Sequence, residues 1–292
     1  MNLTVLQTFL SILEAGSLVR ASERLNVTQS TVTARLKALE EDLGQPLINR
    51  HKTGVTPTAA GLRLKRYAET MTDLWRQARQ ETALPNTVSA VCNIGCQGDL
   101  WPGLGRALFG EIRLRRPEVA LSVWLGGQTE LRTWLDSGLV DLSLTYWPAT
   151  QPRQAMRELA PDRLVLVSTR ADAPLRFDPG YVFVEAGEEF GRWHAEVYAD
   201  ADTARISFGS AVLGLEFILA EGGSAYLPHR LVAALLDEGR LHAVPGAPEF
   251  SRPAYLLVNR SAADGWPWLD AVLAAAVPAV DAGGQASPPD LR

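Results

Sequence analysis

The first part of the chain carries an apolar residue at every third or fourth position, which is the period of an amphipathic helix. The repeating residues are Leu3, Leu6, Phe9, Leu10 and Leu13. They predict a helix over residues 3–15 that ends at Gly16, because glycine readily adopts the left-handed conformation of a helix end. Ser17 is a natural N-cap, and it predicts a second, short helix with Val19, Ala21 and Leu25 on its inner face.

A third helix is predicted from the capping residue Thr28 to about residue 43, with Val32 and Leu36 facing inward. The small Ala21, which lets two helices approach, and the apolar Val27 in the turn complete the pattern of a helix-turn-helix. The second helix of that motif places its N-terminal residues in the major groove of DNA. The polar residues expected to face DNA are Thr28, Gln29, Ser30, Thr33 and Arg35. The alternative is that they form only a solvated helix face.

A β-wing is predicted after Gly44, where QPLINRHKTGVTPTAAG reads as two short extended pieces around a turn. Arg50, His51 and Lys52 would flank the duplex there. Gln29 and Ser30 are expected to contact base edges. Arg35, Arg50 and Lys52 are expected to contact phosphates.

A long amphipathic helix is predicted from about Thr58 to about Thr82. At 1.5 Å per residue it would be about 37 Å long, which is more than a small head can cover. Its apolar side carries Leu64, Tyr67, Ala68, Met71, Leu74, Trp75 and Ala78. The simplest partner for such a stripe is the same helix of a second copy, so we expect a homodimer with contacts at Leu64, Met71, Leu74 and Trp75.

From Val88 onward, short apolar runs alternate with helical stretches, which is the signature of βα units and a parallel sheet. One series runs from AVCNIG to LVDLSLTY, a second runs from YVFVE to HRLVAALLDEG, and PAYLLVN then returns toward the first. The pattern predicts two α/β subdomains, the first of about residues 88–163 with 261–281 and the second of about residues 164–260. Ligands of such sheets bind beyond the carboxyl ends of the strands, in the cleft between the halves.

Several residues are expected at this cleft because they follow predicted strands. They are Asp99, Gln128, Tyr146 and Trp147 from the first half, and Glu185, Phe190, Ser210 and Tyr226 from the second. An alternative role for Asp99 is to cap the helix that follows its own loop. His194, beside Trp193, is expected to be packed or surface-exposed rather than functional.

Composition indicates a soluble globular protein, with 47% hydrophobic and 21% charged residues and a net charge of −5. The charge is unevenly divided. Residues 1–66 carry nine Lys or Arg against five acids, a net of +4, whereas from residue 82 onward 17 arginines stand against 25 acids, a net of −8. A basic head on an acidic body suggests that only the head meets a polyanion. No apolar run approaches the roughly 20 residues that span a bilayer, so we expect a cytoplasmic protein with no membrane partner.

The motifs TQSTVTARLKALEEDLG, LINR and TPTAAG, in this order and spacing, resemble the winged helix-turn-helix and linker helix of LysR-type transcriptional regulators. Ile48 stands where the family usually has an aromatic residue, and Thr33 where it usually has serine. The resemblance implies double-stranded DNA as a partner, a homodimer that commonly pairs into a tetramer, and a possible contact with RNA polymerase.

The same resemblance implies an α+β multidomain chain with a winged helix-turn-helix at residues 1–58 and a linker helix at 59–84. An effector domain of the type 2 periplasmic-binding-protein fold would occupy 85–281, followed by a disordered tail at 282–292. Asp99, Gln128 and Tyr146 occupy positions where the family commonly contacts a small-molecule effector.

Two other classes of protein agree less well with the sequence. An enzyme is disfavoured because the chain has no G-x-S-x-G elbow, H-E-x-x-H pair, P-loop or clustered metal ligands, so no catalytic residue, metal or cofactor is expected. A periplasmic-type solute-binding protein would share the body's fold, but the basic head argues against it. Cys92 and Cys96 are expected to be reduced, packed thiols. The acids Asp99 and Glu185 would repel an anionic effector unless arginines outweigh them, which leaves cationic, neutral or no ligand open.

Overall fold

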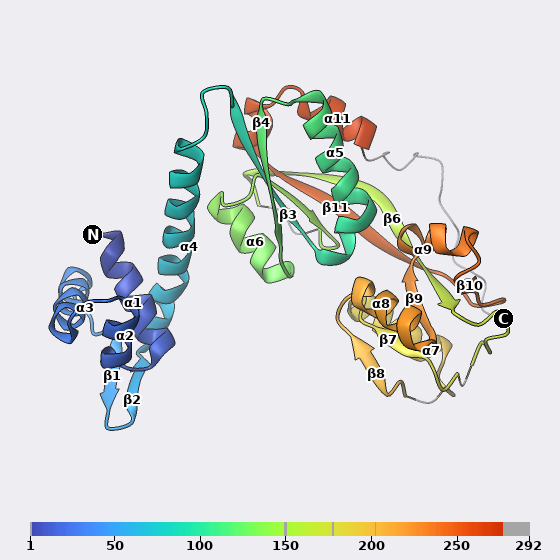
Figure 1. The fold of residues 1–292 in the computed structure, drawn as a ribbon, viewed down its shortest axis with the longest axis horizontal. Helices are drawn as coiled ribbons and strands as arrows, with labels where there is room; N and C mark the ends of the chain where they lie inside the picture. Colours follow the sequence, from blue (N-terminus) through green and yellow to red (C-terminus); the bar gives the residue numbers. More distant parts are fainter. Residues whose placement is uncertain (1, 149–150, 177, 202, 277–292) are drawn as a thin grey trace. The chain divides into compact units, whose positions relative to one another are not determined.

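The computed structural model describes residues 2–148, 151–176, 178–201 and 203–276 (Figure 1). The predicted tail at 282–292 lies outside the described residues, as does the end of the predicted effector domain at 277–281. The chain forms two compact units, Met1–Asn86 and Thr87–Arg292, which we call the head and the body. None of the described helices is long and apolar enough to cross a membrane.

The head begins with three helices, α1 (Leu3–Ala15), α2 (Leu18–Arg24) and α3 (Gln29–Leu43). Ser17 caps α2 and Thr28 caps α3, as predicted. Phe9, Ile12, Ala21, Val32 and Leu36 are fully buried between the three helices. The predicted inner face of α2 is wrong by one residue, because Val19 is 48% exposed and Leu18 is buried instead. On so short a helix, the apolar pattern alone does not distinguish these two positions.

The predicted wing is a two-stranded antiparallel sheet of β1 (Ile48–His51) and β2 (Gly54–Pro57). The long helix α4 (Ala59–Thr82) follows, with Thr58 as its N-cap. The start of α4 lies directly against the chain that enters the wing, because a Cβ added at Gly61 would come within 2.1 Å of the Leu47 carbonyl oxygen. Because Gly61 has no side chain, α4 can lie this close to the wing.

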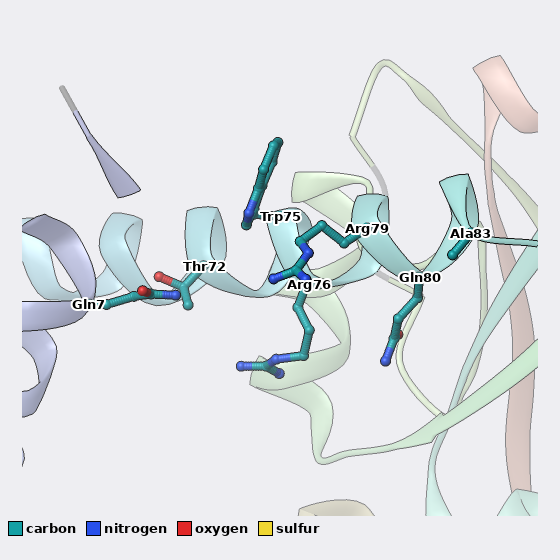
Figure 2. A pocket seen from close by; sticks show the side chains of 7 residues that line it. All are labelled: Gln7, Thr72, Trp75, Arg76, Arg79, Gln80 and Ala83. Carbon is teal, nitrogen blue, oxygen red and sulfur yellow. The ribbon is translucent and has the colours of Figure 1, made fainter. Parts of the chain in front are cut away.

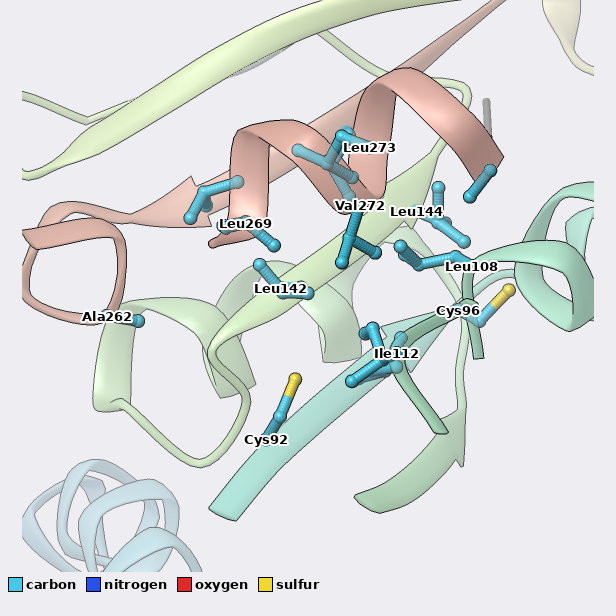
Figure 3. Close-up of a cluster of buried hydrophobic side chains, with 14 of the residues drawn as sticks. Cys92, Cys96, Leu108, Ile112, Leu142, Leu144, Ala262, Leu269, Val272 and Leu273 are labelled. Atoms are coloured by element: carbon cyan, nitrogen blue, oxygen red, sulfur yellow. The ribbon is translucent and has the colours of Figure 1, made fainter. Parts of the chain in front are cut away.

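The first subdomain of the body contains the parallel strands β3 (Ala90–Cys96), β4 (Val119–Leu125) and β5 (Leu142–Thr145). The turns η1 (Gly98–Leu100) and η2 (Trp101–Gly105) lead into α5 (Arg106–Arg115), and α6 (Gln128–Ser137) joins β4 to β5. The short α10 (Arg260–Gly265) and α11 (Leu269–Ala276) complete the subdomain. Figure 3 shows the core between this sheet, α5 and α11, with Cys92 and Cys96 as free buried thiols within it.

Two long antiparallel strands, β6 (Gln154–Ser168) and β11 (Phe250–Asn259), run through both subdomains. They give a seven-stranded sheet of order β10-β6-β11-β5-β3-β4, with β9 also paired to β6. The chain re-enters the first subdomain before the predicted boundary near residue 260, because residues 255–258 already pair with β5. The apolar run PAYLLVN is thus a strand of the first subdomain and not only a connection to it.

The second subdomain consists of the segment between these two long strands. Its elements are β7 (Val182–Val184), α7 (Glu188–Val197), β8 (Ile206–Phe208), α8 (Ala211–Glu221), β9 (Ser224–Pro228), α9 (His229–Asp237) and β10 (His242–Ala243). Aliphatic residues of β6, β7, β9 and α8 form one core, and a second core is rich in aromatic rings around Phe190. The predicted alternation of strands and helices is therefore present in both halves.

Candidate functional site

The N-terminal turn of α3 presents polar side chains to solvent. The Thr28 hydroxyl accepts a hydrogen bond from the Thr31 backbone N–H at 3.2 Å and lies 2.8 Å from the Ser30 hydroxyl. Gln29 and Ser30 are exposed, and the described residues offer the Gln29 side chain no hydrogen bond. Gln29 is therefore free to contact an external partner, whereas Thr28 holds the start of the helix in place.

Arg35 and Thr33, further along α3, are half-buried. The Arg35 guanidinium donates a hydrogen bond to the Thr8 hydroxyl at 3.2 Å, and that hydroxyl donates to the Thr4 carbonyl at 2.7 Å. Arg35 is thus tied to α1, which the sequence pattern did not predict. Its charge still adds to the positive potential of the head.

The wing carries cations without acidic partners. Arg50, His51 and Lys52 are exposed, and His51 Nε2 lies 3.1 Å from the Thr56 hydroxyl. Within the part of the chain that the structure describes, neither Arg50 nor Lys52 forms an ion pair. Their charges are therefore available to an anionic partner such as the DNA backbone.

The linker helix α4 exposes large apolar side chains. Tyr67 is 53% exposed, Met71 40% and Trp75 53%, while Leu74 is half-buried. A hollow of about 460 Å³ lies between α4 and Gln7 of α1, and Trp75 is one of the residues that line it (Figure 2). Leu64 was predicted to belong to the same stripe, but it packs against the core of the head. Leu64 is half-buried, whereas Tyr67, Met71 and Trp75 present more of their side chains to a partner.

In the body, Asp99 joins the two subdomains. Asp99 is buried, and its Oδ1 accepts hydrogen bonds from the Ser210 hydroxyl and the Ala211 backbone N–H, both at 2.8 Å. Asp99 therefore caps α8 of the opposite subdomain, where a negative charge also interacts favourably with the helix dipole. This role differs from both sequence predictions for Asp99, which were a contact with a ligand and a cap on the helix that follows its own loop. The hydrogen bond between Ser210 and Asp99 thus links the two subdomains directly.

A second link between the subdomains is centred on Arg230, near the start of α9. Its guanidinium pairs with both oxygens of Asp162, at 2.5 and 2.7 Å, and donates to the carbonyl oxygens of Asp99 and Pro102. Asp162 also accepts from the Tyr146 hydroxyl at 2.5 Å. Burial alone would lower the pKa of Arg230, but the hydrogen bonds and charge of Asp162 raise it. The ion pair is buried, with the Asp162 side chain only 3% exposed and that of Arg230 19%.

The guanidinium of Arg252, in the same region, has no close acidic partner among the described residues. The Arg252 guanidinium lies over the ring of Tyr146, 3.4 Å from its centroid, which is a cation–π contact. Burial lowers the pKa of Arg252, while the negative charges of Asp99, Asp162 and Glu185 act in the opposite direction. Glu185 uses its carboxylate to accept from the Gly187 N–H at 2.8 Å. Among the described residues, nothing forms a hydrogen bond or ion pair with Arg252.

The remaining predicted cleft residues divide into two groups. Gln128, at the start of α6, is exposed, and so is Trp147, by 53%. Tyr226 was predicted to line the cleft, but this is wrong, since it is 1% exposed and its hydroxyl bonds to Tyr198 and to the Pro248 carbonyl. Phe190 is likewise fully buried. Both aromatic residues belong to the core of the second subdomain.

Sequence reasoning missed Asp162, Arg230 and Arg252. A cation in the first turn of a helix opposes the helix dipole, so Arg230 near the start of α9 was the one local signal of a special role. Its partner Asp162 lies 68 residues earlier in the chain. No spacing rule connects such distant positions, and only the packing of the two subdomains brings them together.

The head and body together define a class of protein that presents a helix-turn-helix with a cationic wing and carries a two-subdomain α/β domain with a polar seam. Two family models match the chain, "Bacterial regulatory helix-turn-helix protein, lysR family" over residues 3–62 and "LysR substrate binding domain" over residues 86–265. The chain belongs to the LysR family of transcriptional regulators, whose members bind DNA and are not enzymes. The resemblance seen in the sequence motifs is confirmed.

Individual relatives agree with this assignment over nearly the whole chain. The transcriptional regulator HdfR of Salmonella schwarzengrund is 28% identical over 260 residues, covering 88% of this chain and 92% of the relative. The structure of CbnR, a LysR family regulator, aligns with a TM-score of 0.68 at 17% identity over 94% of this chain and 98% of that one. DarR of Vibrio fischeri, solved in complex with DNA, aligns with a TM-score of 0.55 at 18% identity over 92% and 98%. The predicted fold class is confirmed.

Proposed function

We propose that this LysR-type regulator reads a specific operator with the first turn of α3, anchors its wing on the flanking phosphates, and acts as a homodimer or a tetramer in the cytoplasm. The observation that carries the proposal is Gln29 at the exposed start of α3, whose side chain forms no hydrogen bond with the described residues, together with the wing cations Arg50 and Lys52, which form no ion pair with them. Glutamine reads adenine in the major groove through a bidentate pair of hydrogen bonds. The DarR structure, which contains DNA, supports the same use of the head.

The exposed stripe of α4 supports self-association. Large apolar side chains at this exposure are disfavoured on an isolated surface, and the stripe would be covered by an α4 helix from a second copy. A dimer also places two heads on one duplex, so each weak half-site contact adds to the other. A tetramer would arise by pairing dimers through the bodies, and contact with RNA polymerase at a promoter would follow from regulation of transcription.

The body is proposed to bind a small effector in the cleft between the subdomains, beside Gln128, Tyr146 and Trp147. The expectation that cleft acids repel an anion changes once their partners are known. In the cleft, Asp162 is paired with Arg230 and Asp99 accepts hydrogen bonds at the start of α8, whereas Arg252 forms no hydrogen bond or ion pair with any described residue. Asp99, Asp162 and Glu185 act on the Arg252 charge without pairing with it. We therefore propose that the effector carries a carboxylate that pairs with Arg252.

A salt titration of operator binding tests the head. Gln29→Ala should cost about 1–3 kcal/mol on the cognate operator and little on scrambled DNA, because it removes base readout. Arg50→Ala should weaken both duplexes alike and reduce the slope of log affinity against log salt by about one unit, because it removes one phosphate contact. Lys65→Ala is the control, since Lys65 pairs with Glu69 on α4 and should leave both affinities unchanged. If Gln29→Ala and Arg50→Ala both behave like this control, the proposed DNA surface is wrong.

The cleft is tested separately with a panel of small carboxylates and their methyl esters. A carboxylate that raises the melting temperature of the parent protein should lose this effect in Arg252→Gln, whereas any effect of its ester should persist. An equal response of acid and ester in the parent would contradict an anionic effector.

A further inference from the structure

The second subdomain contains a cavity of about 750 Å³ that is separate from the cleft residues described above. One wall is a single face of α7, formed by Gly191, His194, Ala195 and Tyr198, which follow the i, i+3, i+4, i+7 spacing of a helix face. The other walls come from the segments before β7 and leading into β8. Cavities of 300–1,000 Å³ are typical of small-molecule sites. The small residues Gly191 and Ala195 leave the space open, and a Cβ added at Gly191 would meet no atom within 4 Å.

The inner wall is aromatic and uncharged. The rings of Tyr181 and His194 stack with centroids 5.5 Å apart and planes at 15°, and the Tyr181 hydroxyl lies 2.7 Å from His194 Nε2. Phe183 adds a third ring. The Tyr198 hydroxyl is used within the fold, at 2.6 Å from that of Tyr226. Burial lowers the pKa of His194, so its ring is neutral near neutral pH. This wall therefore offers ring faces to a ligand.

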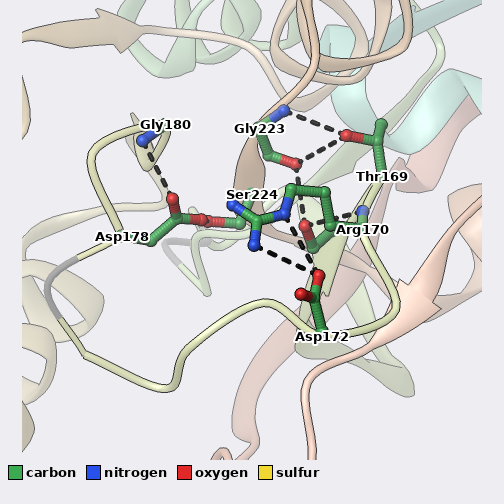
Figure 4. A network of polar contacts seen from close by, with 8 residues as sticks. Thr169, Arg170, Asp172, Asp178, Gly180, Gly223 and Ser224 are labelled. Atoms are coloured by element: carbon green, nitrogen blue, oxygen red, sulfur yellow. Dashed lines mark hydrogen bonds and ion pairs between the residues drawn. The ribbon is translucent and has the colours of Figure 1, made fainter.

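The rim of the cavity carries two arginines, Arg176 and Arg205, and one acid, Asp178. Figure 4 shows that the Asp178 carboxylate is already occupied, by the Gly180 N–H at 2.9 Å and the Ser224 hydroxyl at 2.5 Å. Arg176 lies 3.8 Å from the Asp200 carboxylate and donates a hydrogen bond to the Val197 carbonyl at 3.5 Å, and its side chain is about half exposed. Arg205 is exposed and, within the described ranges, forms no ion pair. An anionic group at the rim would thus meet Arg205, which has no ion-pair partner among the described residues, and Arg176, which is paired loosely with Asp200.

We propose that this cavity is a second ligand site of the regulator and that it binds an aromatic carboxylate. The aromatic ring lies against Tyr181, Phe183 and His194 beside Gly191, and the carboxylate pairs with Arg205 at the rim, with Arg176 adding to the positive potential. The site lies entirely within the second subdomain. Its occupancy is therefore independent of the effector that pairs with Arg252 in the cleft.

The probe for this site is 1-naphthoate, titrated by calorimetry into the full-length protein, with 1-naphthalenemethanol as the uncharged counterpart. Gly191→Phe fills the cavity from the helix wall and should weaken 1-naphthoate binding at least about tenfold. Gly191→Ala is the matched control, because it adds only a methyl group in open space and should change the affinity less than about twofold. Operator binding should be unchanged in both variants, and an unchanged melting temperature of the body shows that the substituted subdomain is folded.

Arg205→Gln tests the class of ligand. It should weaken 1-naphthoate binding several-fold and leave binding of 1-naphthalenemethanol unchanged, because only the acid pairs with the guanidinium. Loss of 1-naphthoate binding in Arg252→Gln but not in Gly191→Phe would place the probe in the cleft and overturn the proposal. No binding of 1-naphthoate to the parent protein at millimolar concentration, or equal effects of Arg205→Gln on acid and alcohol, would overturn it as well.

Discussion

The ion pair between Asp162 and Arg230 provides a direct test of how the body is held together. Asp162→Asn keeps the size of the side chain but removes its charge, and it leaves the Arg230 guanidinium buried without a counter-ion. The Asp162 side chain is 3% exposed and that of Arg230 19%, so water cannot replace the lost partner. Removing one member of a buried pair typically costs about 3–5 kcal/mol, since the remaining charge is uncompensated.

The neighbouring residue provides a matched control. Arg163 pairs with Glu249 through two hydrogen bonds of 2.9 Å, but both side chains are about half exposed, at 56% and 50%. Glu249→Gln removes the same charge from the same kind of bidentate pair in water, where such pairs contribute about 0–1 kcal/mol. The two substitutions thus differ mainly in how deeply the ion pair that each one breaks is buried.

The assay is thermal and urea unfolding of the full-length protein, followed by tryptophan fluorescence. For a domain of this size, 1 kcal/mol shifts the melting temperature by about 2–4 °C, so we expect a loss of at least about 6 °C for Asp162→Asn and at most about 4 °C for Glu249→Gln. The double variant Asp162→Asn/Arg230→Gln should recover part of the loss, because no lone charge then remains buried. If Asp162→Asn costs no more than Glu249→Gln, the buried pair does not stabilise the contact between the subdomains.

Two other predictions concern the linker helix and the aromatic cavity. Trp75→Glu should yield monomers by light scattering. Leu62→Glu is the control, at a 58% exposed site on the opposite side of α4, and should leave the dimer intact. Dimers in both variants would exclude this stripe as the interface. Burial lowers the pKa of His194 in the folded state, so below its ordinary value the unfolded chain binds a proton that the folded chain does not. Stability should therefore fall as the pH drops from about 7 to about 5, and His194→Gln should flatten that slope; an unchanged slope would mean that His194 does not contribute to it.

The head could be predicted almost completely from its sequence because its signals are local. Ser17, Thr28 and Thr58 cap the helices that begin one residue later, and the left-handed Gly16 and Gly44 end two of them. Leu64 shows the limit of this reasoning. The period of α4 places it on an apolar side, but only the packed structure distinguishes a residue that faces the head from one that faces a partner.

The cleft was less predictable because its residues are defined by their partners. Asp99 and Ser210 do lie between the two subdomains, but there the Ser210 hydroxyl donates a hydrogen bond to the Asp99 carboxylate. Tyr226 follows the strand pattern that suggests a pocket wall, but its ring completes an aromatic core. Arg252 lies near the start of β11, beside a shift in the strand register, and only the packed structure shows that no described residue pairs with it. These facts depend on contacts between distant segments, which no local pattern contains.

The discontinuous first subdomain also bears on the order of events during synthesis. Its sheet needs β3 and β5 from one part of the chain and β11 from much later, and its core includes α11. The head and the second subdomain, in contrast, each draw their cores from shorter stretches of chain. Domains generally fold as units as they leave the ribosome, and contacts between distant segments form late. We therefore expect the nascent head to be able to fold while the first subdomain still exposes β3 and β5, so that this sheet remains open to chaperones until β11 emerges and closes it.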